Sequence, residues 1–269
     1  MSEKILFTSE AGRSTVPAPA LARRRTSAGF GRLVRIELRK SVDTRAGRWL
    51  LAGVAIIGVA MTFVAMFTGD PDDHTFPRSA SSIQGAMAVL LPIVSILLVT
   101  SEWSQRTALQ TFVLTPRRGR VIAAKLAAGA ALAVAVAVLG IVLSALATQL
   151  AGTHPTVGEW RQAGVVLVAS VSVQLLSQLS GMGFGLLLLH SPAAIVANFV
   201  IPIAWAALGG GIAALHGVQP WLDPAKATEN LLGGHMNAHR WAQVGVVVLV
   251  WVVALIAAGL IRLRRKDIS

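Results

Sequence analysis

The chain has 269 residues, of which 54% are hydrophobic and only 13% are charged, and its mean hydropathy is +0.67. A water-soluble domain carries about twice this share of charged residues, so the composition excludes an ordinary soluble domain. Cysteine is absent, which excludes disulfides, a thiolate nucleophile and cysteine ligands for a metal.

The first 28 residues are rich in Ala, Pro, Arg, Ser and Thr and poor in apolar residues. This composition predicts a disordered tail, 1–28, ahead of one membrane domain over 29–269. The pair Arg23-Arg24 could belong to a twin-arginine export signal, but the first long apolar run starts only at Trp49. We therefore interpret the segment as a cytoplasmic tail rather than as a targeting signal.

The segment 30–42 has an apolar face and a basic face at helical spacing. The apolar face is formed by Phe30, Leu33, Val34 and Leu38. The basic face, nearly opposite, is formed by Arg32, Arg35 and Arg39. This pattern predicts a helix in the membrane interface, with its basic face toward anionic lipid headgroups. The helix could serve only as an anchor, or it could also contact a cytoplasmic partner.

Six long apolar runs follow. Because about 20 residues of helix cross the roughly 30 Å hydrocarbon core, these runs predict an all-α polytopic membrane protein with six transmembrane helices. The runs are 49–68, 83–100, 126–150, 163–189, 194–215 and 242–261. Pro92 in the second run and Pro202 in the fifth predict kinks, more typical of helix packing than of a gate.

The distribution of basic residues predicts the orientation. The segments 1–48, 101–125 and 262–269 contain 20 of the 24 Lys and Arg residues. Because Lys and Arg are retained on the cytoplasmic side, both termini and 101–125 are expected in the cytoplasm. An even number of spans requires the same of the termini. The net charge of +12 then belongs to the inner membrane face, and nucleic-acid binding is not expected.

A short helix, interfacial or re-entrant, is expected on the outer surface over about 221–233. Asp223 is a good N-cap, Pro224 suits the first helical position, and Gly233 suits the end.

The sequence lacks the residues that several kinds of function require. No G-x-x-x-x-G-K-[ST] motif is present, so nucleotide binding by a P-loop is not expected. No nucleophile, base and acid form a convincing set, so we predict neither an enzyme nor a cofactor. The span interiors have no charged residue, which argues against an ion-coupled carrier. His235 and His239 are four residues apart, but two histidines in a loop are too few to predict a metal site.

The fourth run is the most polar of the six. Gln174, Ser177 and Gln178 can share one helical face, and the spacing Gly181-x-x-x-Gly185 permits close approach of another helix. We favour interhelical packing and hydrogen bonding for these residues. A contribution to a substrate path is the alternative.

A polar stretch separates the second and third runs. Residues from Glu102 to Leu114 predict a short helix, closed by Thr115-Pro116. Basic residues follow it: Arg117, Arg118, Arg120 and, where the third run begins, Lys125. A helix in this place, over about 101–116, could move both attached spans when pushed. It could equally be an inert connector.

The stretch resembles the permease subunits of type-2 ATP-binding cassette transporters, a class with many bacterial drug exporters. That family has an acidic residue, then Gly-Thr, then Pro followed by Arg, and a Lys before the third span. The matching residues here are Glu102, Thr107, Pro116, Arg117, Arg118 and Lys125. The resemblance extends over about 30–269, and one departure is Arg106 in place of the Gly.

The resemblance implies a mechanism. The helix over about 101–116 would be a coupling helix seated on a separate ATPase subunit, and a second permease, identical or a sister chain, would complete the transmembrane domain. Uncharged spans suit export of an apolar or amphipathic substrate. The residues expected to couple the chain to the ATPase are Glu102, Trp103, Arg106, Thr107, Arg117 and Arg118.

Two other functions remain open on the sequence. A non-transporting scaffold or sensor would have the same spans and no ATPase, whereas a channel or secondary carrier would show flux without ATP. The excess of Arg over Lys, with abundant Ala and Val, is typical of a GC-rich bacterial genome, so we expect the bacterial cytoplasmic membrane.

Overall fold

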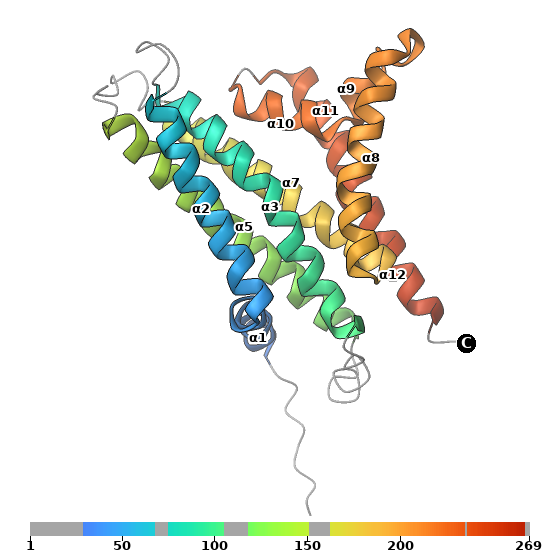
Figure 1. Ribbon diagram of the computed structural model, residues 1–269. Helices are drawn as coiled ribbons and strands as arrows, with labels where there is room; N and C mark the ends of the chain where they lie inside the picture. Colours follow the sequence, from blue (N-terminus) through green and yellow to red (C-terminus); the bar gives the residue numbers. More distant parts are fainter. Residues whose placement is uncertain (1–28, 68–74, 105–117, 151–161, 235, 267–269) are drawn as a thin grey trace, which may run out of the picture.

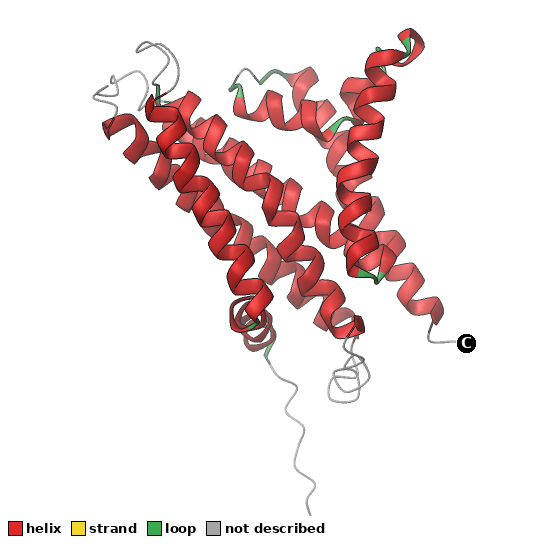
Figure 2. Ribbon diagram, in the orientation of Figure 1, coloured by secondary structure: helices red, strands yellow, loops and turns green. Residues whose placement is uncertain are grey.

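The computed structural model describes residues 29–67, 75–104, 118–150, 162–234 and 236–266. Within these ranges the chain is helical apart from short connections, as Figure 2 shows. The all-α prediction is therefore confirmed for the described residues. The expected tail over 1–28 lies outside them.

Six helices are long and apolar enough to cross a membrane, as predicted. They comprise α2 (Arg45–Phe67), α3 (Phe76–Ser104), α5 (Arg118–Leu150), α7 (Ala163–Leu188), α8 (Ser191–Gly211) and the continuous helix formed by α11 (Ala238–Val248), η3 (Leu249–Ala254) and α12 (Leu255–Lys266). The chain is therefore built as a multi-pass membrane protein. The fifth span ends at Gly211 instead of continuing to 215, because the chain turns there into the short helix η2 (Ala213–Leu215).

Helices α3 and α7 form the centre of the bundle. Helix α3 packs against α2, α5, α7 and α8, and α7 packs against α5 and α12 as well (Figure 1). Of the most apolar stretch of α3, 61% of the residues are buried, against 17% in α2 and in α8. The apolar side chains that α2 and α8 leave exposed suit contact with lipid, where apolar surface is not penalised.

The amphipathic segment forms helix α1 (Phe30–Asp43), as its pattern predicts. Figure 1 shows it almost end-on beside the lower end of α2, so it lies across the spans and not along them. The corner between α1 and α2 depends on Gly47. A Cβ at this position would lie 1.9 Å from the Ser41 carbonyl oxygen, so the close approach requires glycine.

The segment expected to form a short outer helix over 221–233 is helical, and its place on the outer surface stays a prediction. The helix is α10 (Pro224–Leu232), preceded by α9 (Gln219–Leu222). The Asp223 carboxylate accepts hydrogen bonds from the backbone N–H of Ala225 and Lys226, at 2.9 and 3.4 Å. On the exposed face, a hydrogen bond to Glu229, followed by the attraction between the two charges, raises the pKa of Lys226.

A π-helical turn in the middle of the last span was not predicted. This turn, η3, carries Trp251, whose indole N–H donates a 2.8 Å hydrogen bond to the carbonyl oxygen of Leu222. Its ring also lies against Phe184 of α7, with centroids 6.1 Å apart. The turn thus joins the last span both to α7 and to the connection between α9 and α10.

Candidate functional site

The residues expected to couple the chain to an ATPase fall at a boundary of the described structure. The backbone at Glu102 and Trp103 continues α3, and Arg118 begins α5. Arg106, Thr107 and Arg117, and the side chains of the other three, lie outside the described residues, as does most of the expected helix over 101–116. Its coupling role stays a prediction. The structure does describe the two helix ends that flank this segment.

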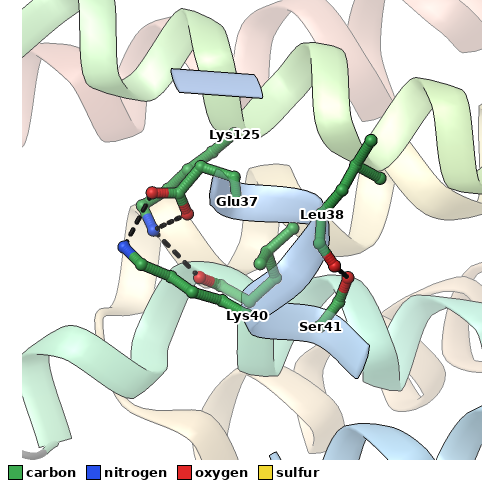
Figure 3. A network of polar contacts seen from close by, with 6 residues as sticks. Glu37, Leu38, Lys40, Ser41 and Lys125 are labelled. Carbon is green, nitrogen blue, oxygen red and sulfur yellow. Dashed lines mark hydrogen bonds and ion pairs between the residues drawn. The ribbon is translucent and has the colours of Figure 1, made fainter. Parts of the chain in front are cut away.

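Beside these ends lies a buried ion pair between α1 and α5. The Lys125 ammonium donates a 2.6 Å hydrogen bond to Glu37 Oε2, and both side chains are about 95% buried (Figure 3). The Lys40 ammonium donates to the other oxygen, Oε1, at 2.7 Å. We refer to Glu37, Lys40 and Lys125 as the ion-pair cluster. Buried charges are tolerated when they are paired and hydrogen-bonded, and both carboxylate oxygens of Glu37 meet this condition.

The ion-pair cluster also reaches α3. The Lys125 ammonium donates a 3.4 Å hydrogen bond to the carbonyl oxygen of Leu98, two residues before Thr100 in α3. One ammonium group therefore contacts α1 and α3 while belonging to α5. It fixes the relative positions of three helices at the place where α3 ends and α5 begins.

Sequence reasoning missed Glu37. Leu33, Val34, Leu38 and Ser41 surround it on the face of α1 that packs against the bundle, whereas Arg32, Arg35 and Arg39 are exposed, as predicted. A single acid on the apolar face of an amphipathic helix was the available signal. The sequence marks its partner, Lys125, through the transporter resemblance, and no local pattern pairs it with Glu37.

Two further polar contacts join helices at the same end of the bundle. The Thr100 hydroxyl of α3 lies 2.7 Å from the Ser191 hydroxyl that begins α8. The Arg262 guanidinium of α12 donates to the carbonyl oxygen of Leu187, near the end of α7. In Figure 1 the ends of α3, α7 and α12 and the start of α8 all lie in the lower part of the molecule.

The polar residues predicted on the fourth span make contacts between helices. Gln174 Nε2 donates to the side-chain and backbone oxygens of Gln84 in α3, at 2.7 and 3.1 Å. The Ser177 hydroxyl donates to the carbonyl oxygen of Ala88, at 2.5 Å. Gln178 is fully buried one turn after Gln174. Gln174 and Ser177 therefore contact α3 of the same chain, and Gln178 lies beside Gly129 of α5.

The two predicted glycines allow α7 and α3 to approach closely. A Cβ on Gly181 would lie 2.4 Å from Ser95 Oγ and 2.8 Å from the Pro92 carbonyl oxygen. A Cβ on Gly185 would lie 3.3 Å from Val99 Cβ. Gly181 and Gly185 therefore pack against α3, as expected of small residues spaced by four in a membrane helix.

A cavity of about 460 Å³ opens at the other end of the bundle, between α3, α7 and α10. Its lining is uncharged and consists of Thr75, Pro77, Ala80, Ser81, Gln162, Val165, Val166, Ala169, Leu231, Leu232, Gly233 and Gly234. We refer to it as the upper cavity.

Only one histidine of the pair His235 and His239 lies in the described part of the chain. His235 lies outside it. His239 contacts the Trp221 ring edge-on, with centroids 5.2 Å apart, and lies 3.2 Å from Gln243 Nε2. The described residues contain no group of three His, Cys, Asp or Glu side chains placed to hold an ion.

No protein-family model matches the chain, and no curated protein shows a significant match. The comparisons therefore add no support to the transporter resemblance.

Proposed function

We propose that the chain is the membrane-spanning permease subunit of a type-2 ATP-binding cassette transporter in the bacterial cytoplasmic membrane. ATP is hydrolysed by a separate subunit, and both termini face the cytoplasm. Six membrane-capable helices and the ordered motif residues from Glu102 to Lys125 support this function.

The ion-pair cluster is the observation that carries the proposal. Lys125 joins α5 to α1 and contacts α3. It lies near the end of α3 and the start of α5, the two helices that flank the segment 105–117. A force applied to that segment then acts on α1, α3 and α5 as one body, because separating Lys125 from Glu37 would leave buried charge uncompensated. Transmitting a force from the segment to the spans requires α1, α3 and α5 to move together, whereas an inert connector does not require it.

The substrate we infer is apolar or amphipathic, and it is exported. The spans offer no pair of charged groups along their length that would bind a free ion. The exposed apolar faces of α2 and α8 leave surface for lipid and for a second permease, identical or a sister chain.

Co-purification tests the proposal. The tagged chain is expressed with its neighbouring genes, extracted in mild detergent and examined for a bound ATPase. The variant Glu102→Ala/Arg117→Ala/Arg118→Ala is expected to lose that ATPase while remaining folded. The control variant Lys226→Ala/Glu229→Ala removes an exposed ion pair on α10, at the opposite end of the bundle from the end of α3 and the start of α5, and is expected to retain the ATPase.

Recovery of the ATPase with the wild type and the control, but not with the triple variant, supports the permease. If folded wild-type protein brings down no ATPase, the transporter proposal fails. The scaffold or sensor function then becomes the better account of the same six spans.

A further inference from the structure

Three polar side chains form a continuous row along α7. Ser170, Gln174 and Gln178 are spaced by four residues, so they lie one above another on one helical face. Each has no exposed surface. We refer to Ser170, Gln174 and Gln178 as the polar row.

The polar row has more hydrogen-bonding capacity than the described residues satisfy. Gln174 Nε2 is used by Gln84, but Gln174 Oε1 has no partner among them. The same is true of Ser170 Oγ and of both amide atoms of Gln178. Leaving a buried polar group without a hydrogen bond destabilises the folded state, so four such atoms in one row call for a partner.

The upper cavity lies directly above the row. Val166 lines the cavity and precedes Ser170 by one helical turn, while Ala80 lines it and precedes Gln84 by one turn. The polar row therefore begins where the upper cavity ends, along the contact between α3 and α7. Both are uncharged, which suits a small neutral ligand rather than an ion.

Glycine on α5 shapes the inner end of the row. A Cβ on Gly129 would lie 3.6 Å from Gln178 Nε2 and 2.5 Å from Met182 Sδ. Met182 Sδ therefore fills the position that a side chain at Gly129 would take, next to the unpartnered amide of Gln178. Met182 is fully buried and marks the inner end of the row.

We propose that water enters the upper cavity and continues along the polar row to Gln178, in the seam between α3, α5 and α7. Buried waters typically make about three hydrogen bonds to polar groups that the protein itself leaves unsatisfied. The row presents such groups at each turn of α7, and the cavity supplies the route from the surface. The inlet is blind, since it ends at Gln178 and Met182 in the core.

X-ray radiolytic footprinting tests the inlet, because hydroxyl radicals formed from water oxidise nearby methionine sulfur. The purified full chain in lipid nanodiscs is irradiated, and the oxidation rates of Met182 and Met87 are compared by mass spectrometry. Both methionines are fully buried. Met87 is the matched control, because it packs in the apolar cluster with Ile83 and Leu91.

In the wild type, Met182 is expected to oxidise several-fold faster than Met87. Gln178→Leu removes the innermost amide, and Ala169→Phe fills the floor of the cavity. Either change is expected to lower the Met182 rate toward that of Met87, while a slow Met87 shows that the core remains intact. Equal, slow oxidation of the two methionines in the wild type overturns the proposal, whatever the variants do. Rapid oxidation of Met182 that persists in both folded variants overturns it as well.

Discussion

Lys125 Nζ lies 2.6 Å from Glu37 Oε2 across 88 residues of sequence, with both side chains almost fully buried. Helix α1 is thus bonded into the bundle by charge as well as by its apolar face. An interfacial helix held only by lipid would be free to slide. This pair gives α1 a fixed position relative to α3 and α5.

Breaking the ion pair should be costly. Glu37→Leu leaves Lys125 buried without its carboxylate, and we expect the free energy of unfolding to fall by about 3–5 kcal/mol. Lys125→Met should cost less, since Lys40 still neutralises Glu37. Unfolding in mixed micelles by added SDS, followed by circular dichroism, measures both.

Two further variants control this prediction. The double variant Glu37→Leu/Lys125→Met should recover most of the loss, because well-packed apolar groups often replace a buried pair without cost. Lys226→Met breaks the exposed pair on α10 and should cost less than about 1 kcal/mol. The electrostatic account fails if Glu37→Leu is no more costly than Lys226→Met.

Gly181 provides a test of the contact between α3 and α7. Gly181→Ala places a Cβ 2.4 Å from Ser95 Oγ and within 3 Å of the Pro92 backbone. Such overpacking should lower the free energy of unfolding by about 1–3 kcal/mol. The same SDS titration measures it.

Gly85→Ala is the matched control, since a Cβ there meets nothing within 4 Å. Gly85 lies within α3, so alanine should raise stability by about 0.5–1 kcal/mol through helix propensity. Equal effects of the two substitutions would mean that close approach of the helices does not depend on Gly181.

The contrast between predicted and unpredicted features follows from the range of the interactions. Hydropathy identifies six spans because lipid acts on each helix separately, and Asp223 caps α10 through atoms within three residues of it. The pairing of Glu37 with Lys125 depends on how α1 packs against α5, which no local pattern encodes. The polarity of Gln174 was visible in the sequence, but its partner Gln84 was not.

The N-cap of α10 can be tested separately. Asp223→Ala removes the acceptor for the N–H groups of Ala225 and Lys226, and should cost about 0.5–2 kcal/mol. Asp223→Asn keeps an acceptor oxygen and should cost less. Hydrogen exchange of the α10 amides locates the effect. A cost for Asp223→Ala spread evenly over all helices would contradict a local capping role.

The orientation of the chain can be tested directly, because the absence of cysteine allows single cysteines to be introduced without background. Lys226→Cys lies on an exposed part of α10, and Arg265→Cys lies on an exposed part of α12 at the opposite end of the bundle. If the basic segments are cytoplasmic, a membrane-impermeant maleimide should label Lys226→Cys in intact cells and Arg265→Cys only after permeabilisation. Total labelling after permeabilisation should be equal for the two variants, which controls for expression and thiol reactivity. Labelling of Arg265→Cys in intact cells would place the basic end outside, and no cytoplasmic ATPase could then reach the segment between α3 and α5.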